Sequence, residues 1–422
     1  MKLHVSSFYL PVRRGMKDNI PQKGSIQGMN YVFADRVASL QPSAIREILK
    51  YTSDPSVISF AAGNPAPEAF PVEEVRRISE RLMQENPIGA LQYAVTEGYA
   101  PLREHLSDYM KRKHRVGREF DQILITAGAQ QAMDLATKSL CNEGDAVLCE
   151  SPSFIGSLNA FRSYGLKLCG IPMQDDGMDI EALEQAMKKE KQARFLYTIP
   201  NFQNPSGITM SMEKRRRVYE LARQYGFMII EDNPYGDIRF AGEHIPAIKS
   251  LDEDGIVIYV GSFSKVLSPG MRVGYAIAPA QVIAKMTVCK QTSDVHTNIW
   301  AQMVAYEFMT GYDYEAHLGR IRKIYEHKAG LMMDCFDREL GARLSCNRVE
   351  GGLFLWPTLP KGIDMPSFCK QAVQRKVAVV PGNAFLMDEG EPCQSFRINF
   401  STPTDEQLEQ GMTILGDLVR QL

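Results

Sequence analysis

The sequence predicts an α/β fold with a mostly parallel central sheet and a second, smaller α+β domain. From about residue 121 onward, short apolar runs alternate with helical patterns. These runs are apolar almost throughout, as is typical of parallel strands in a sheet covered on both faces. Near the end of the chain, residues 350–356 and 395–400 instead have the pattern of antiparallel strands. A chain of 422 residues is long enough for two or three domains.

The strands of the large sheet are expected to end at a common site. The predicted strands are residues 122–126, 145–149, 195–198, 227–230, 256–260 and 273–278. Polar or small residues lie just past several strand ends, namely Gly128, Ser153, Asn204, Asp232, Tyr235, Ser262 and Lys265. Because parallel sheets bind ligands beyond the carboxyl ends of their strands, we expect these residues to meet.

Helical periodicity fills the intervals between and around these strands. The predicted helices are residues 72–85, a helix ending near 113, 130–140, 213–225 and a long stretch from 285 to about 336. Thr404 and Gln407 form a capping-box pattern at the start of the last helix. That helix is expected to turn four apolar residues inward, Leu408, Met412, Leu415 and Val419.

Composition favours an ordinary globular protein of a reducing compartment. Apolar residues make up 44% and charged residues 23%, and the net charge of −2 gives no electrostatic reason to expect nucleic acid or an anionic membrane as partner. No apolar run is long enough to span a bilayer. The eight cysteines form no C-x-x-C pair, so neither a metal site nor a redox motif is indicated. We therefore expect a cytoplasmic protein without a metal.

The segment 261–274, GSFSKVLSPGMRVG, carries the strongest chemical signal. Ser262, Ser264 and Arg272 are of the types that bind a phosphate, and Lys265 supplies an amine among them. An amine beside an anion site suggests covalent chemistry with a phosphorylated carbonyl compound, most often pyridoxal phosphate. On this segment alone, a solvated lysine in a Ser/Gly loop is the favoured alternative.

Other segments would complete such a site. The turn Gly128-Ala129-Gln130 precedes a predicted helix, and a helix start attracts anions, although on this segment alone an ordinary turn is the favoured interpretation. Asp232 could keep a pyridine nitrogen protonated, or simply cap a loop. Arg397 lies between apolar neighbours in a predicted strand and needs an anionic partner, which is either a substrate carboxylate or a structural one.

Taken together, the motifs resemble a known family. In order they are L-Q-Y at 91–93, G-x-Q at 128–130, N-P-S-G at 204–207, D-x-x-Y at 232–235, S-F-S-K at 262–265 with G-M-R-x-G at 270–274, and F-R-x-N-F at 396–400. This series resembles the class I/II pyridoxal-phosphate aminotransferases of fold type I. It is most similar to the 2-aminoadipate/kynurenine aminotransferase-like branch, which is itself similar to the enzyme half of the MocR-type regulators. The resemblance runs from about Tyr31 to the C-terminus.

The resemblance implies a role for each cofactor-binding residue. Lys265 would bind the cofactor covalently, Asp232 would pair with its ring nitrogen, and Phe154 would stack on its ring. Asn204 and Tyr235 would bind the ring hydroxyl. The phosphate would be held by Ser262, Ser264, Arg272 and the backbone of Gly128, Ala129 and Gln130. Tyr93 would reach the phosphate of the neighbouring subunit, which implies a homodimer with shared active sites.

The resemblance also implies how the substrate binds. Arg397 and Asn204 would hold the α-carboxylate, and Gly63 would line the substrate pocket. Arg46 could select a side-chain carboxylate, with a solvated helix arginine as the alternative. Two residues depart from the family pattern: Ala129 replaces a hydroxyl residue of the phosphate turn, and Ala62 replaces a second glycine before Gly63.

The implied activity is a ping-pong transfer of an amino group from an L-amino acid to 2-oxoglutarate, with 2-aminoadipate, aromatic or branched-chain donors. A pyridoxal-phosphate lyase or decarboxylase, or a cofactor-binding regulatory module without turnover, are the alternatives. We expect a large cofactor-binding domain at 76–299 and a small discontinuous domain at 29–75 and 300–422. Residues 1–28 are expected to be a disordered extension, with a start at Met29 as the alternative.

Overall fold

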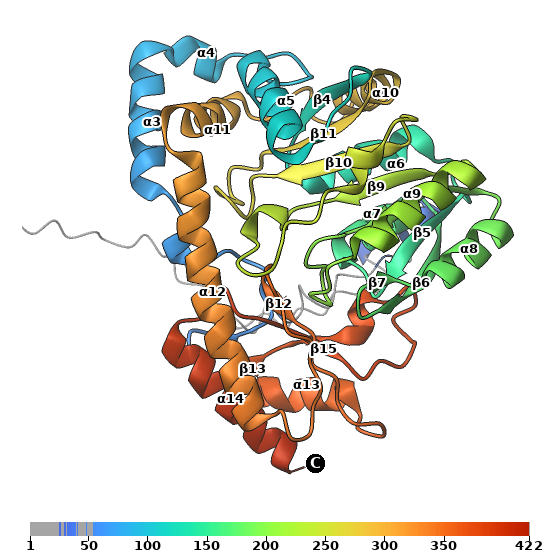
Figure 1. Ribbon diagram of the computed structural model, residues 1–422, viewed down its shortest axis with the longest axis vertical. Coiled ribbons are helices and arrows are strands. Elements are labelled where there is room, and N and C mark those ends of the chain that lie inside the picture. The colour runs from blue at the N-terminus through green and yellow to red at the C-terminus, as the bar shows by residue number, and fades with distance from the viewer. Residues whose placement is uncertain are drawn as a thin grey trace, which may run out of the picture.

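An eight-stranded sheet organises the molecule (Figure 1). The computed structural model describes residues 25–26, 29–30, 32–38, 40, 48 and 54–421. The strand order is β4-β11-β10-β9-β8-β5-β6-β7. The strands are β4 (Asp121–Thr126), β5 (Ala146–Ser151), β6 (Lys167–Gln174), β7 (Gly177–Met178), β8 (Ala193–Thr198), β9 (Met228–Asp232), β10 (Val257–Ser262) and β11 (Gly274–Pro279). From β10 through β6 all neighbours are parallel, whereas β11 and β7 run antiparallel to theirs, so the predicted mostly parallel sheet is confirmed.

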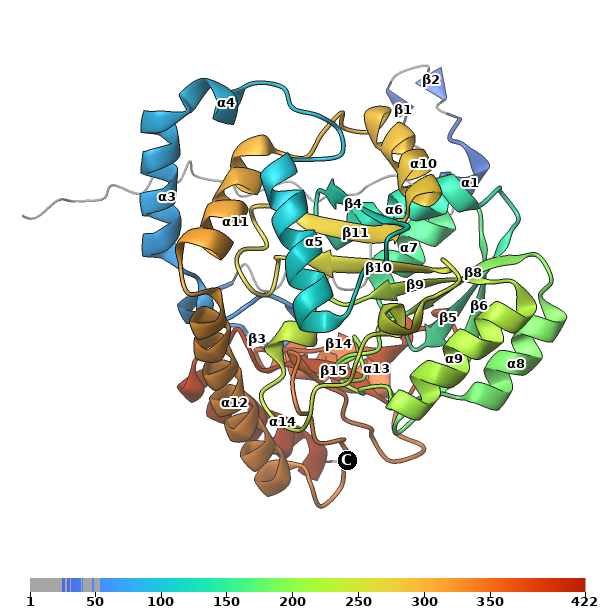
Figure 2. The ribbon, with the colours of Figure 1, turned by 45° about the horizontal axis from the view of Figure 1, so that its top comes forward.

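Helices cover both faces of this sheet, as the apolar strands predict. Along β5, Val147 and Cys149 belong to one core cluster and Leu148 to another. Along β8, Phe195 and Tyr197 join the first cluster and Leu196 the second. In Figure 2, α5, α8 and α9 lie in front of the sheet, and α6 and α7 lie behind it. Because side chains alternate along a strand, both faces of the central strands are buried.

Five predicted helices agree closely with observed ones, namely α3, α5, α6, α9 and α14, and one predicted helical stretch differs. They are α1 (Asp35–Ala38), α3 (Val72–Glu85), α4 (Pro87–Leu91), α5 (Ala100–His114), α6 (Ala129–Leu140), α7 (Ile155–Ser163), α8 (Ile180–Lys189), α9 (Met212–Tyr225), α10 (Ala280–Gln291), α11 (Ile299–Gly311), α12 (Tyr314–Glu339), α13 (Met365–Gln374) and α14 (Asp405–Arg420). The long stretch predicted from 285 to 336 is three helices rather than one. Side chains of Asn298 and Asp313 accept hydrogen bonds from the first-turn N–H groups of α11 and α12, and they thereby start new helices.

A smaller part of the chain packs below the large sheet (Figure 1). Its strands are β3 (Ile58–Ser59), β12 (Phe354–Leu355), β13 (Val377–Ala378), β14 (Val380–Pro381) and β15 (Phe396–Asn399). β15 pairs antiparallel with β12 and β14, which confirms the predicted antiparallel pattern. The long helix α12 extends from the large sheet down to this part and packs on α14. Both halves of the capping box at Thr404 are formed, and the four predicted inward residues of α14 are buried.

The remaining elements are short. They are the 3-10 helices η1 (Pro67–Ala69), η2 (Gly236–Ile238), η3 (Ile248–Leu251) and η4 (Gly382–Phe385), and an antiparallel pair of β1 (Ser25–Ile26) with β2 (Met29–Asn30). Arg46 and residues 1–24 lie outside the described residues. The predicted division into domains at 76 and 299 remains a prediction.

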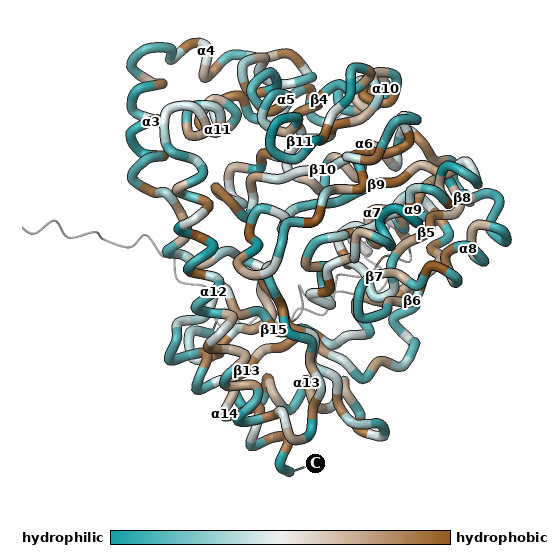
Figure 3. The backbone as a smooth tube through the Cα atoms, viewed as in Figure 1, coloured by the Kyte–Doolittle hydropathy of each residue, from teal (hydrophilic) through white to brown (hydrophobic). Residues whose placement is uncertain are grey.

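Hydropathy follows this arrangement. Figure 3 shows hydrophobic stretches along the central strands and alternating hydrophilic and hydrophobic segments along outer helices such as α3. On α3 the buried residues are Ile78 and Leu82, one helical turn apart, as an amphipathic helix requires. None of the helices in the described part of the chain has the length and apolar character needed to cross a membrane.

Candidate active site

A cavity of about 350 Å³ lies at the carboxyl ends of the parallel strands. Loops after β4, β5, β8, β9 and β10 meet there with β12, β15 and the segment after β3. The lining residues are Gly63, Asn64, Ala129, Gln130, Met133, Phe154, Ile199, Asn204, Asp232, Pro234, Tyr235, Ser262, Ser264, Lys265, Arg272, Phe354 and Arg397. Most residues of the predicted site are therefore neighbours in space.

The amine of Lys265 belongs to the loop between β10 and β11. It donates a hydrogen bond to the backbone carbonyl oxygen of Gly63 at 2.7 Å. Burial, together with the positive charges of Arg397 and Arg272, lowers the pKa of this amine to about 8. Near neutral pH a fraction of such an amine is unprotonated, so it can act as a nucleophile and as a base.

An anion cradle lies on one side of this amine. The hydroxyls of Ser262 and Ser264 are 3.0 Å apart, and the Ser264 N–H points to the Ser262 hydroxyl at 3.1 Å. Gly128 precedes α6 with a φ of +78°, and a Cβ there would lie 2.4 Å from Nη2 of Arg272. Only glycine therefore lets the arginine lie against the start of the helix, where N–H groups are free for an anion. The cradle fits a phosphate.

Asp232 lies at the end of β9 and is buried, with 2% of its surface exposed. Its Oδ2 accepts a hydrogen bond from the Tyr197 hydroxyl at 2.8 Å, whereas Oδ1 has no partner among the described residues. Burial raises the pKa of this carboxyl to about 7, and the hydrogen bond from Tyr197 opposes that rise. An orphaned buried carboxylate oxygen on a cavity wall fits a protonated ring nitrogen.

Arg397 projects from β15 and is also buried. Its Nη1 donates to Asn204 Oδ1 at 2.8 Å and its Nη2 to the Ala61 carbonyl at 2.7 Å. Asn204 Nδ2 in turn donates to the Tyr235 hydroxyl at 3.3 Å. The guanidinium lies 4.3 Å from the Phe354 ring centre, and its Nε has no hydrogen-bond partner among the described residues. Burial lowers the pKa of Arg397 to about 10.

The structural carboxylate considered as an alternative partner for Arg397 is absent from the described part of the chain, where no acidic side chain forms an ion pair with it. A buried guanidinium without a counter-ion is costly, and a bound carboxylate would relieve that cost. Arg397 therefore fits an anionic substrate group at the cavity.

Among the described residues, Tyr93, Gly128 and Ser153 of the predicted site do not line this cavity. Tyr93 is 81% exposed, and its ring packs edge-on against His296, 5.8 Å between ring centres. Gly128 lies against the Arg272 guanidinium, which is itself a lining residue. Arg46 lies outside the described residues.

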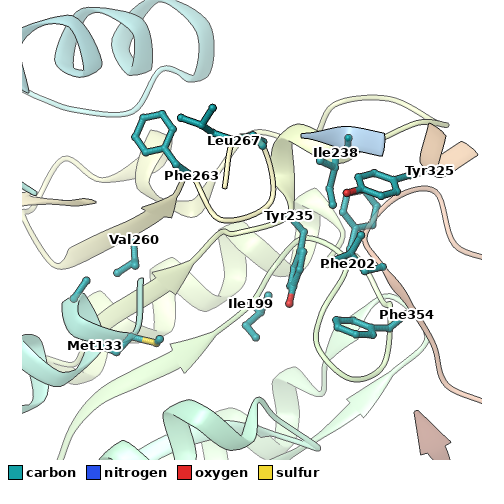
Figure 4. Close-up of a cluster of buried hydrophobic side chains, with 14 of the residues drawn as sticks. Met133, Ile199, Phe202, Tyr235, Ile238, Val260, Phe263, Leu267, Tyr325 and Phe354 are labelled. Atoms are coloured by element: carbon teal, nitrogen blue, oxygen red, sulfur yellow. The ribbon is translucent and has the colours of Figure 1, made fainter. Parts of the chain in front are cut away.

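Sequence reasoning missed several residues of the site. Met133, Ile199 and Phe354 are apolar residues that line the cavity. In Figure 4, Ile199 and Phe354 lie beside the Tyr235 ring, and Met133 lies farther away on the side of Ile199. Met133 lies within α6, Ile199 just after β8, and Phe354 in β12. Apolar residues at such positions resemble ordinary core residues, so no sequence signal separates them. Glu150, at the end of β5, is fully buried and accepts hydrogen bonds from the Thr198 hydroxyl, the Ile199 N–H and the Gln203 amide. Burial raises the pKa of Glu150 to about 7.

The cavity thus combines an anion cradle, a partly neutral amine, a buried carboxylate oxygen without a partner and a buried guanidinium without a counter-ion. The first three fit the phosphate, carbonyl and ring nitrogen of pyridoxal phosphate, and the fourth fits the carboxylate of an amino acid.

Comparisons with known proteins agree with this fit. The family described as aminotransferase class I and II matches residues 55–415. Aromatic-amino-acid aminotransferase 1 of Thermococcus litoralis is 37% identical over 393 residues, 92% of this chain and 94% of that protein. The 2-aminoadipate transaminase of Thermus thermophilus is 37% identical over 92% of this chain and 97% of its own length. A helix-turn-helix transcriptional regulator of Bacillus subtilis, YisV, is 30% identical over 90% of this chain and 77% of its own length.

Solved structures agree as well. The crystal structure of Pyrococcus horikoshii kynurenine aminotransferase in complex with PMP superposes with a TM-score of 0.89 at 36% identity, over 92% of this chain and 97% of that one. Residues 55–415, which the family model matches, contain the large sheet, the cavity and most of the smaller part. The chain belongs to the class I and II aminotransferases, and it is a pyridoxal-phosphate-dependent transaminase of fold type I.

Proposed function

We propose that this enzyme moves the amino group of an L-amino acid to 2-oxoglutarate in two half-reactions, as a cytoplasmic homodimer. The observation that carries the proposal is the meeting in one cavity of three groups: the Lys265 amine, the Asp232 carboxylate and the Arg397 guanidinium. Among the described residues, Oδ1 of Asp232 and Nε of Arg397 have no hydrogen-bond partner. A cytoplasmic location is supported by the eight cysteines, all of which are free thiols, as expected in a reducing compartment.

Residues of the cradle bind and orient the cofactor. Ser262, Ser264 and Arg272 hold its phosphate together with the start of α6, and Phe154 covers the ring. Asn204 and Tyr235, which are already hydrogen-bonded to each other, bind the ring hydroxyl. When bound, pyridoxal phosphate supplies a carbonyl that takes up amino groups and a ring that withdraws electrons from the Cα of the amino acid.

Lys265 first holds the cofactor and is then released by the incoming amino acid. Its free amine would take the proton from the substrate Cα and deliver it to the cofactor carbon that had carried the carbonyl oxygen. A base must be unprotonated to do this, and the lowered pKa of Lys265 supplies the neutral amine near physiological pH. The carbonyl of Gly63 holds the amine beside the cavity while it is free.

Arg397 binds the α-carboxylate of the amino acid, and Asn204 steadies the guanidinium for it. A guanidinium can pair with a carboxylate through two parallel hydrogen bonds, which fixes the orientation of the substrate as well as its position. The aromatic wall of Phe354 and Tyr235 then excludes water from the same space.

The donors are expected among 2-aminoadipate, aromatic and branched-chain amino acids. Support comes from the relatives named for aromatic amino acids, 2-aminoadipate and kynurenine. The direct test is a panel of these donors with 2-oxoglutarate, in which glutamate and the new 2-oxo acid are both measured. Equal amounts of the two products are expected, whereas ammonia or carbon dioxide in place of glutamate would contradict a transaminase in favour of a lyase or decarboxylase.

Selection of acidic donors is assigned to Arg46. Arg46→Ala should raise KM for 2-aminoadipate and leave KM for aromatic donors unchanged. Arg216→Ala, which removes an exposed arginine of α9, serves as the matched control. Unchanged use of acidic donors by Arg46→Ala would refute this role.

A homodimer is supported by an apolar surface segment after α3. Ile88 is 72% exposed, Leu91 73%, Tyr93 81% and Val95 58%. Contiguous exposed apolar residues of this kind mark surfaces that a partner covers. A second copy seated there would bring Tyr93 to the phosphate cradle of its neighbour. Sedimentation of the purified enzyme tests the dimer, and a monomer at micromolar concentration would contradict it.

A further inference from the structure

Tyr197 is the residue in contact with Asp232 on the side away from the cavity. It lies on β8, the strand beside β9, and its register partner on β9 is Ile230. Tyr197 and Asp232 both project toward the face that α6 and α7 cover, and the Tyr197 hydroxyl donates to Asp232 Oδ2 at 2.8 Å. Both side chains are almost fully buried, so their polar groups must be paired.

A second hydroxyl fixes the direction of this hydrogen bond. Ser157 of α7 donates to the Tyr197 oxygen at 2.9 Å. The thioether sulfur of Met133 is also within reach of the Ser157 hydroxyl, but a hydroxyl oxygen is the stronger acceptor. Because Ser157 donates to the Tyr197 oxygen, the Tyr197 proton is left for Asp232. The ring of Phe161 packs edge-on against Tyr197 at 5.4 Å and holds it in place.

We propose that Tyr197 is a positioning residue of the reaction: it keeps Asp232 ionised and occupies Oδ2, so that Oδ1 is left to accept the proton of the cofactor ring nitrogen. This inference rests on the proposed function, in which Asp232 binds that nitrogen. Tyr197 itself does not line the cavity, so it acts only through Asp232.

The competing effects on Asp232 explain why the contact matters. Burial alone favours the protonated carboxyl, which carries its own hydrogen and cannot pair with a protonated ring nitrogen. A hydrogen bond donated to the carboxylate favours the ionised form, and among the described residues Tyr197 is the side chain that donates one. Removing the Tyr197 hydroxyl therefore makes Asp232 a weaker partner for the protonated ring nitrogen. The nitrogen then loses its proton more readily, and an unprotonated ring withdraws electrons less well.

The test uses holoenzyme carrying 15N-labelled pyridoxal phosphate, with Tyr197→Phe as the variant. Phenylalanine keeps the ring packing and removes only the hydroxyl. We expect the ring nitrogen of the variant to lose its proton at least one pH unit lower than in wild type, as read from its 15N chemical shift. The Kd of the cofactor should rise roughly tenfold or more, the loss expected for a hydrogen bond to a charged group. kcat should fall while KM for the amino donor changes little.

The matched control is Tyr164→Phe. It removes another tyrosine hydroxyl that donates to a carboxylate, that of Asp134 at 3.0 Å, away from the cavity. This variant should behave as wild type in all three measurements. The proposal would be overturned if Tyr197→Phe and wild type had the same 15N titration of the ring nitrogen and the same Kd for the cofactor.

If Tyr197→Phe does not fold, as judged by urea unfolding, Ser157→Ala replaces it. That variant keeps Tyr197 and Asp232 and removes only the donor that orients the hydroxyl. A smaller shift of the ring-nitrogen titration in the same direction is expected, and no shift would overturn the proposal. Failure of wild type to transfer amino groups would instead refute the proposed function, while the 15N titration would still report on Tyr197 and Asp232.

Discussion

Lys265 and Gly63 are 202 positions apart in the chain, yet the Lys265 amine donates to the Gly63 carbonyl oxygen at 2.7 Å. The contact joins the loop after β10 of the large sheet to the segment after β3 of the smaller part. The reactive amine is therefore held where the two parts of the molecule meet, beside Arg397 and the anion cradle.

The pH dependence of cofactor binding follows from this environment. Lys265 must be neutral to attack a carbonyl, and burial and the nearby arginines lower its pKa from 10.5 to about 8. The rate at which the cofactor-free protein binds pyridoxal phosphate covalently should therefore rise with pH and reach its midpoint near 8. Stopped-flow absorbance at a series of pH values measures this. Arg397→Met, which removes a positive charge, should move the midpoint upward, and a wild-type midpoint near 10.5 would contradict the account.

Two buried arginines allow a sharp comparison. Arg215 donates to the backbone carbonyls of Met210, Pro200, Ile245 and Pro246 and to the Asn201 side chain, so its hydrogen-bonding capacity is used within the fold. Arg397 instead has an unpaired Nε and lines the cavity. Arg397→Met should raise KM for the amino donor roughly 10- to 100-fold, the value of hydrogen bonds to a charged group.

Arg215→Met is the control for that measurement. It should lower the free energy of unfolding by about 3 to 5 kcal/mol, because several buried carbonyls lose their donor. Compared with Arg215→Met, Arg397→Met should lower the free energy of unfolding less and raise KM for the amino donor more. Urea unfolding and steady-state kinetics on both variants separate the two effects, and equal kinetic defects in the two would contradict a substrate role for Arg397.

The phosphate cradle depends on a glycine at position 128. Gly128→Ala would place a Cβ 2.4 Å from the Arg272 guanidinium, so the arginine must move. We expect the Kd of pyridoxal phosphate to rise about tenfold or more. Gly226→Ala is the control, because Gly226 also has a positive φ, +75°, but nothing lies within 4 Å of a Cβ there. Gly226, with ψ of 33°, is in the left-handed helical region, so Gly226→Ala should lose about 1 kcal/mol of stability. Gly128, with ψ of 171°, is in a region that is nearly restricted to glycine, so Gly128→Ala should lose about 1 to 3 kcal/mol. Only Gly128→Ala should weaken cofactor binding.

Much of this site was predictable because a parallel sheet gathers its strand ends. Asp232, Asn204 and Lys265 each follow an apolar strand. Because the carboxyl ends of parallel strands lie at one edge of a sheet, their proximity could be predicted without any knowledge of tertiary contacts. Tyr197 was not predictable, because its meeting with Asp232 depends on the register of β8 against β9. Phe354 likewise reaches the cavity only through the packing of the smaller part on the large one. No element was predicted within residues 155–189, where the structure has α7, β6 and α8. The exposed, mixed pattern of β6 explains why that strand was missed. By contrast, α8 has an amphipathic pattern, with Leu183 and Met187 buried one turn apart, that could have been found from the sequence.

Glu150 should make stability depend on pH in an unusual direction. Burial raises its pKa from 4.5 to about 7, so the folded protein binds a proton that the unfolded chain has released between these values. The contribution of Glu150 to stability is therefore full below pH 4.5 and is lost as pH rises through 7. Glu150→Gln, which cannot ionise, should remove this dependence and gain up to about 3 kcal/mol relative to wild type at pH 8. Urea unfolding of the cofactor-free protein at pH 5 and pH 8 measures it, and an equal difference between the two proteins at both pH values would contradict this role.

Shared active sites can be tested by mixing two defective subunits. Tyr93→Ala should bind the cofactor weakly, and Lys265→Ala should be inactive. In a mixed dimer, one site would combine an intact Lys265 with the partner's intact Tyr93. Co-expression of the two variants should therefore restore cofactor affinity and activity in that site. No gain over Tyr93→Ala alone would place Tyr93 outside the neighbouring site.

The most direct test of the central claim is transfer by Lys265→Ala. Wild type and the control Lys323→Ala, which changes an exposed lysine of α12, should convert an amino donor and 2-oxoglutarate to glutamate and show the absorption band of covalently held pyridoxal phosphate. Lys265→Ala should lose that band, and its transfer rate should fall by at least about a thousandfold, since it lacks both the attachment point and the base. A variant that keeps the band and the rate would contradict the assignment of Lys265 as the residue that carries the reaction.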